Sequence, residues 1–129
     1  MALTAFAGPL SNLIMGFVFL IILHAVAVFF TLSMPLIYIL LFLEFAAQIN
    51  LSLAVFNLIP IPPLDGSKIL AALLPDRLYY KLMQYERYFY IILILLLVGG
   101  TLSGPLNTLV NALYGAFSWL AGLIFRGFA

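Results

Sequence analysis

The sequence predicts an all-α, polytopic transmembrane helix bundle of about four spans, with a proline-rich broken segment after the second span. Of the 129 residues, 67% are hydrophobic and 7% are charged, and the mean hydropathy is +1.28. Soluble domains carry about a quarter charged residues, so this composition excludes a water-soluble domain and makes the lipid bilayer the expected surroundings. The net charge is +1, and the five basic residues cannot form the concentrated basic face that nucleic-acid binding requires. This excludes a nucleic-acid partner.

The first two predicted spans cover residues 13–32 and 36–59. Pro9 precedes the first span, and a proline fits the first turn of a helix, where its missing N–H is not needed. The short sequence Ser33-Met34-Pro35 separates the two apolar runs. So short a connection predicts an antiparallel helical pair.

A break follows in the segment Asn57–Gly66, which reads Asn-Leu-Ile-Pro-Ile-Pro-Pro-Leu-Asp-Gly. Its three prolines exclude helix interior, because each lacks a backbone donor and disfavours α geometry in the residue before it. We therefore expect an extended stretch. Irregular backbone at membrane depth persists only where protein buries it or where it lines a wet cavity, so the break indicates the place of a functional site.

Residues 67–87 hold most of the charge and predict a segment that lies at the membrane interface. Five of the seven tyrosines lie between Tyr79 and Tyr90, as in an interfacial aromatic belt. The third and fourth predicted spans cover residues 88–102 and 106–125, the third being short for a full crossing. All these segments form a single transmembrane domain, residues 1–129.

The basic residues predict the orientation of this domain. Lys68, Arg77, Lys81 and Arg87 favour a cytoplasmic location for the 67–87 segment, because positive residues near span ends set the topology. With two spans before this segment and two after it, both termini are expected to be cytoplasmic as well. The protein is then a multi-pass protein of the cell membrane.

The decapeptide Asn57–Gly66 closely resembles the second metal-site motif of the site-2 proteases, a family of intramembrane zinc metalloproteases. The earlier Ala7-Gly8-Pro9-Leu10-Ser11-Asn12 resembles the Gly-Pro-x-x-Asn start of the helix that follows the catalytic helix in this family. The segments Ile49–Phe56 and Leu74–Arg77 are similar to those of prokaryotic members, so the resemblance covers most of the chain.

The resemblance implies a zinc ion held by two histidines of a His-Glu-x-x-His helix and by the aspartate of the Leu-Asp-Gly sequence. Asp65 is the residue that matches this aspartate. Catalytic zinc takes three protein ligands and an open position for water. Asn57, Pro60, Pro62 and Gly66 are then expected to shape the cleft or bind substrate. The competing interpretation makes Asp65 the N-cap of a helix that begins at Gly66, since aspartate is a good capping residue.

The sequence departs from the family pattern because its only histidine is His24, and no His-Glu-x-x-His is present. We therefore assign a catalytic role to none of these 129 residues. We expect the chain to be the carboxy-terminal portion of an intramembrane zinc metalloendopeptidase. Such an enzyme hydrolyses peptide bonds of membrane-embedded protein substrates. This portion would contribute the third zinc ligand and the cleft wall. Alone it would be inactive, and it would bind zinc only when an amino-terminal catalytic helix completes the site.

Two alternatives of other classes stay open. One is a catalytically dead pseudoprotease or membrane scaffold that keeps the cleft to bind a helix or a partner. The other is a small transporter-like module, since broken helices also build ion sites.

Polar residues within the predicted spans have structural interpretations. Glu44, Gln48 and Ser52 recur every four residues and share one stripe of the second span. An intramembrane glutamate suggests function by default, but here we favour one that faces the bundle, bonded to Gln48 or His24. His24 matches no ligand position of the family and is expected to be a packed, neutral histidine.

Overall fold

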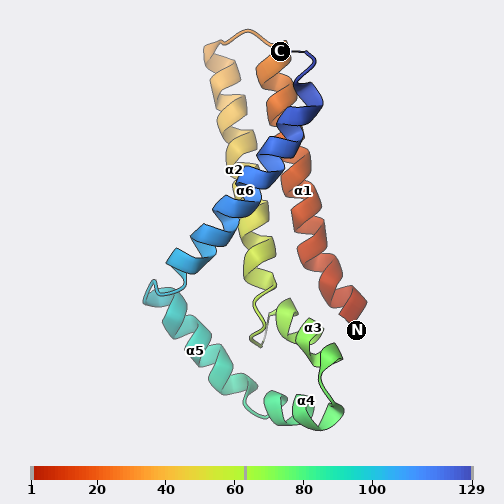
Figure 1. The fold of residues 1–129 in the computed structure, drawn as a ribbon. Helices are drawn as coiled ribbons and strands as arrows, with labels where there is room; N and C mark the ends of the chain where they lie inside the picture. The colour runs from red at the N-terminus through yellow and green to blue at the C-terminus, as the bar shows by residue number, and fades with distance from the viewer. Residues whose placement is uncertain (1, 63, 129) are drawn as a thin grey trace.

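The computed structural model describes residues 2–62 and 64–128, and within them it contains six helices and no strand. Pro63 of the proline-rich segment lies outside the described residues. The all-helical prediction is confirmed. In chain order the helices are α1 Ala2–Phe29, α2 Met34–Asn57, α3 Asp65–Leu73, α4 Asp76–Met83, α5 Glu86–Val98 and α6 Ser103–Phe125 (Figure 1).

Three of these helices, α1, α2 and α6, are long and apolar enough to cross a membrane. Many large apolar side chains on them are exposed, among them Ile14, Phe42 and Trp119, as expected for surfaces that face lipid. The helix in the third expected span, α5, has 13 residues. At 1.5 Å per residue it is about 20 Å long, shorter than the hydrocarbon core of about 30 Å.

The core lies where the three long helices meet. Helices α1 and α2 form an antiparallel pair, and a Cβ built on Gly16 of α1 would lie 2.8 Å from Leu51 Cδ2 of α2. Glycine at this position therefore permits the close approach of the two helices. Helix α6 packs against both of them, with Ala121 buried beside Leu20 and Ala47 (Figure 1).

The amino-terminal part of α1 differs from the expectation that a helix starts at Gly8-Pro9. Helix α1 begins at Ala2, and Pro9 lies inside it. Since proline lacks an N–H, the carbonyl of Ala5 loses its helical donor there. Pro9 is nevertheless fully buried, in a part of the chain where α3 packs against α1. This packing offsets the cost of a proline in the helix.

The end of α6 lies beside the end of α1. Phe29 makes ring contacts with Phe125 and Phe128, at centroid distances of 6.1 and 5.6 Å. Figure 1 shows that α5 and α6 both rise from the α4 end of the molecule toward the turn between α1 and α2. The chain end after α6 thus lies away from α3 and α4, whereas the expected scheme of four crossings puts both termini on the side of residues 67–87. Because α5 is shorter than the hydrocarbon core, the number of crossings stays a prediction for labelling to test.

The three long helices predict that Gln84, between α4 and α5, and Gly127 lie on opposite sides of the membrane. The chain has no cysteine, so Gln84→Cys and Gly127→Cys each supply one thiol within these residues. A membrane-impermeant maleimide applied to intact cells should label only one of the two variants, and lysis should expose the other. Labelling of both from the same side would show that α5 crosses the membrane.

Candidate functional site

The site predicted from the proline-rich motif lies where α2 ends and α3 begins. Beyond Asn57 the chain turns: the Ile61 N–H donates to the Ile59 carbonyl at 2.8 Å, and the Leu64 N–H to the Ile61 carbonyl at 2.9 Å. Leu64, the residue before α3, has the φ and ψ of extended backbone. The expectation of an extended stretch is therefore wrong for the turn residues, because local hydrogen bonds fold the segment back.

Gly66 is the second residue of α3, and the fold leaves no room for a side chain there. A Cβ at this position would collide with the backbone carbonyl oxygens of Leu58 and Ile59. Ser67, which is buried, donates a hydrogen bond from its hydroxyl to the Leu64 carbonyl at 2.7 Å. The start of α3 is thus held against the end of α2, and this contact fixes the position of Asp65.

Asp65 is the first residue of α3, and its carboxylate faces α1. A Cβ built on Gly8 would lie 3.0 Å from Asp65 Oδ2, so a glycine in α1 makes room for this carboxylate. The N-cap residue of α3 is Leu64, with no side-chain capping bond. Among the described residues, no hydrogen bond or ion pair to the Asp65 carboxylate is present. The capping interpretation requires a hydrogen bond from a backbone N–H of α3 to this carboxylate, so the geometry does not agree with it.

A cavity of about 610 Å³ opens beside Asp65 between α1, α3 and α4. Besides Asp65, its polar lining includes Lys68, Asp76 and Tyr79. The sequence predicts for these three residues only a segment at the membrane interface. Lys68 follows Asp65 by three residues, and this spacing puts two residues on one face of a helix. That spacing could have identified Lys68 from the sequence. The contribution of α4 depends on the turn after α3 and had no such signal.

The other residues predicted to shape the cleft lie apart from this cavity. Asn57 ends α2 and is half-buried, Pro60 is exposed and Pro62 is buried. None of the three lines the cavity beside Asp65. In the structure, Pro60 and Pro62 belong to the turns that return the chain to α3.

The described residues do not form a zinc site on their own. Within them no group of three histidine, cysteine, aspartate or glutamate side chains is close enough to hold a metal ion. His24 follows Gly8, the neighbour of Asp65, by sixteen residues of α1, which is about 24 Å along the helix. Asp65 and His24 therefore cannot share one ion, and Asp65 remains a single candidate ligand.

Glu44 and His24 have structural partners within the bundle. Gln48 Nε2 donates to Glu44 Oε1 at 3.0 Å, as expected, and the Tyr114 hydroxyl donates to Glu44 Oε2 at 2.6 Å. The latter bond joins α2 to α6 and was not foreseen, because the sequence does not show which face of α6 meets α2. His24 bonds through Nδ1 to the Leu20 carbonyl at 2.8 Å in its own helix.

Comparison with known proteins gives consistent matches. A family model described as "Peptidase family M50" matches residues 24–100, which include the break and α3. The Bacillus subtilis (strain 168) protein named "Putative zinc metalloprotease YwhC" is 36% identical over 117 residues, covering 85% of this chain and 51% of that protein. The Methanocaldococcus jannaschii protein named "Putative zinc metalloprotease MJ0611" is 44% identical over 66 residues, covering 51% of this chain and 31% of that protein. The chain thus spans about half the length of the first relative and about a third of the second. No solved structure matches it.

The contact at Gly66 predicts a strong effect of Gly66→Ala on stability. The added methyl group would push α3 away from the Leu58 and Ile59 carbonyls, and we expect a lower unfolding temperature in detergent. Gly115→Ala in α6 is the matched control, since a Cβ there meets nothing within 4 Å. Alanine in place of a helical glycine is favourable by about 0.5–1 kcal/mol, so this control should be at least as stable as the parent. Equal unfolding temperatures for the two variants would contradict the close contact at Gly66.

Proposed function

Because the chain belongs to peptidase family M50, the site-2 proteases, we propose that it forms the carboxy-terminal portion of an intramembrane zinc metalloendopeptidase. This enzyme hydrolyses peptide bonds of membrane-embedded protein substrates. The observation that carries the proposal is the Asp65 carboxylate, which lines a cavity and has no hydrogen bond among the described residues.

The surroundings of Asp65 support its role as the third zinc ligand. Zinc accepts carboxylate oxygens beside histidine nitrogens, and a ligand must be free to turn toward the ion. Gly8 leaves space next to Oδ2, and Gly66 fixes the helix start from which the side chain projects. Asn57, Pro60 and Pro62 shape the chain reversal that holds Asp65 in place.

The remaining ligands and the general base come from a His-Glu-x-x-His helix outside these 129 residues, and zinc is bound only when that helix completes the site. The lipid bilayer surrounds the bundle, and the partner in the reaction is a transmembrane protein substrate. The basic residues of α3, α4 and the start of α5 support a cytoplasmic location for this end of the molecule. The family resemblance supports a prokaryotic source.

A pseudoprotease is the second candidate. It rests on the cavity beside Asp65, which the described residues form whether or not zinc is bound. In that case the cavity beside Asp65 would bind a partner without hydrolysing it. Zinc content and substrate cleavage of the complete parent protein separate the two candidates.

Replacing Asp65 in the complete protein tests the ligand role. Asp65→Asn removes an anionic ligand with little change in volume, so we expect both zinc per chain and the rate of substrate cleavage to collapse. Asp76→Asn is the matched control, because Asp76 lines the same cavity from α4. It should keep its zinc, measured by atomic absorption, while cleavage is followed on gels. An Asp65→Asn protein with normal zinc and activity would exclude Asp65 as a ligand, whereas a complete parent protein that neither holds zinc nor cleaves the substrate would favour the pseudoprotease.

The 129-residue chain by itself is expected neither to retain zinc nor to cleave peptides. One protein ligand cannot hold a catalytic zinc ion, which needs three. Purified chain dialysed in detergent should contain far less than one zinc per molecule and should leave a transmembrane substrate intact. Chelator-sensitive cleavage by the chain alone would mean that the site lies elsewhere in these residues.

A further inference from the structure

Helix α4 has an uncovered amphipathic surface at the end of the bundle. Leu78 and Leu82 lie on one side of this helix, four residues apart, and Arg77 and Lys81, with the same spacing, lie on another side. Leu78 is 49% exposed, and none of the extensive helix contacts among the described residues includes α4. The apolar side of α4 thus lacks an extensively packed helix partner.

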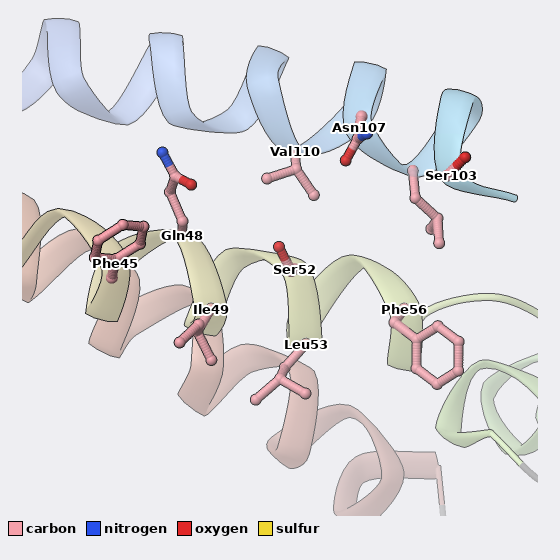
Figure 2. A pocket seen from close by; sticks show the side chains of 10 residues that line it. Phe45, Gln48, Ile49, Ser52, Leu53, Phe56, Ser103, Asn107 and Val110 are labelled. Atoms are coloured by element: carbon pink, nitrogen blue, oxygen red, sulfur yellow. The ribbon is translucent and has the colours of Figure 1, made fainter. Parts of the chain in front are cut away.

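The facing sides of α2 and α6 differ from this surface because side chains of both helices meet there. A cavity of about 440 Å³ lies between the two helices. Figure 2 shows Gln48 and Ser52 extending from α2 toward α6, and Val110 extending from α6 toward α2. Helix α4, in contrast, lies at the end of the molecule, beyond the end of α2 (Figure 1). Its surface therefore requires an occupant from outside the bundle.

The charge of this part of the chain favours an anionic occupant. Residues 67–87 contain four of the five basic residues of the chain and two acidic ones. Arg77, Lys81 and Arg87 are exposed, and within the described residues no ion pair joins them to an acidic side chain. Guanidinium and ammonium groups form strong, charge-assisted hydrogen bonds with phosphate oxygens. Exposed, unpaired basic groups are thus available to phosphate groups.

The other side chains of this segment favour a lipid surface as the source of the phosphate. Tyr80, Tyr85 and Tyr88 are exposed, and tyrosine concentrates at the boundary between membrane and water. A helix with one apolar side and one basic side lies in the plane of this boundary, its apolar side toward the acyl chains. A membrane surface therefore covers both sides of α4 at once, whereas a soluble anion would leave Leu78 exposed to water.

We propose that Arg77 and Lys81 bind the phosphate groups of anionic phospholipids, and that this contact holds α4 in place on the membrane surface. Helix α4 contributes Asp76 and Tyr79 to the wall of the cavity beside Asp65. The lipid contact therefore sets the position of this wall. The inference goes beyond the proposed function, because it holds whether or not zinc is bound.

Thiol labelling tests the proposal in the complete protein with Leu78→Cys as its only thiol. Vesicles of phosphatidylcholine alone are compared with vesicles that also contain phosphatidylglycerol, and the reagent is the uncharged N-ethylmaleimide. We expect labelling to be about fivefold slower in the anionic vesicles, the effect of one basic residue at a negative surface. High salt screens this attraction and should remove the difference. Gly127→Cys, beyond α6, is the control thiol, and its labelling rate should change far less.

Charge variants assign the effect to α4. Arg77→Gln combined with Lys81→Gln should abolish the protection of Leu78→Cys, whereas Arg77→Lys combined with Lys81→Arg should keep it. Arg126→Gln is the matched control, because it removes a basic residue at the end of α6. It should leave the protection unchanged. Ala72→Cys lines the cavity from α3, so its labelling reports on the wall and should become slower together with that of Leu78→Cys.

Three results would overturn the binding of lipid by α4. They are equal labelling of Leu78→Cys in both kinds of vesicle, protection that survives Arg77→Gln with Lys81→Gln, and protection by soluble glycerol phosphate in phosphatidylcholine vesicles. The last result would indicate a site for a soluble anion. Labelling of Ala72→Cys that does not depend on the lipid would refute the effect on the cavity wall. None of these measurements requires zinc or hydrolysis, so they remain decisive if Asp65 proves not to be a ligand.

Discussion

The close approach of Gly66 to the carbonyl groups of Leu58 and Ile59 is the constraint on which the candidate site depends. A chain that leaves a membrane helix must satisfy its backbone groups internally, and the turns between α2 and α3 do so with short local hydrogen bonds. Because position 66 has no side chain, α3 can then return against α2. The Asp65 carboxylate consequently reaches α1, where a second glycine, Gly8, leaves room for it.

The bundle that carries this site is held by small residues and by one polar bond between helices. Gly16 and Ala47 let the long helices approach closely, and hydrocarbon cannot drive their association as water would. The bond from Tyr114 to Glu44 gives α6 a defined partner on α2. An intramembrane glutamate thus has a structural role here, whereas Asp65 has no comparable bond in the part of the chain that the structure describes.

The sequence predicted the features that depend on composition and on local chemistry. Apolar run lengths predicted α1, α2 and α6, and the prolines predicted that a helix ends near Asn57. Tertiary contacts decided what the sequence did not predict. Pro9 lies inside α1 because α3 packs against that part of the helix. The cavity lined by Asp65, Lys68 and Asp76 depends on how two short helices follow one another, and apolar periodicity carries no such information.

The turn at Gly99 and Gly100 has a consequence for the cooperativity of folding. Gly100 has a φ of +72°, a conformation that glycine adopts without strain, so the bend between α5 and α6 is encoded locally. Helices α4 and α5 have no extensive packing against α1, α2 or α6. With this distribution of contacts, α4 and α5 form a less stable region that can unfold locally while the three long helices stay assembled. Asp65 is held by α1 and α2 and therefore belongs to the more stable region. The α4 wall of its cavity belongs to the region that unfolds first.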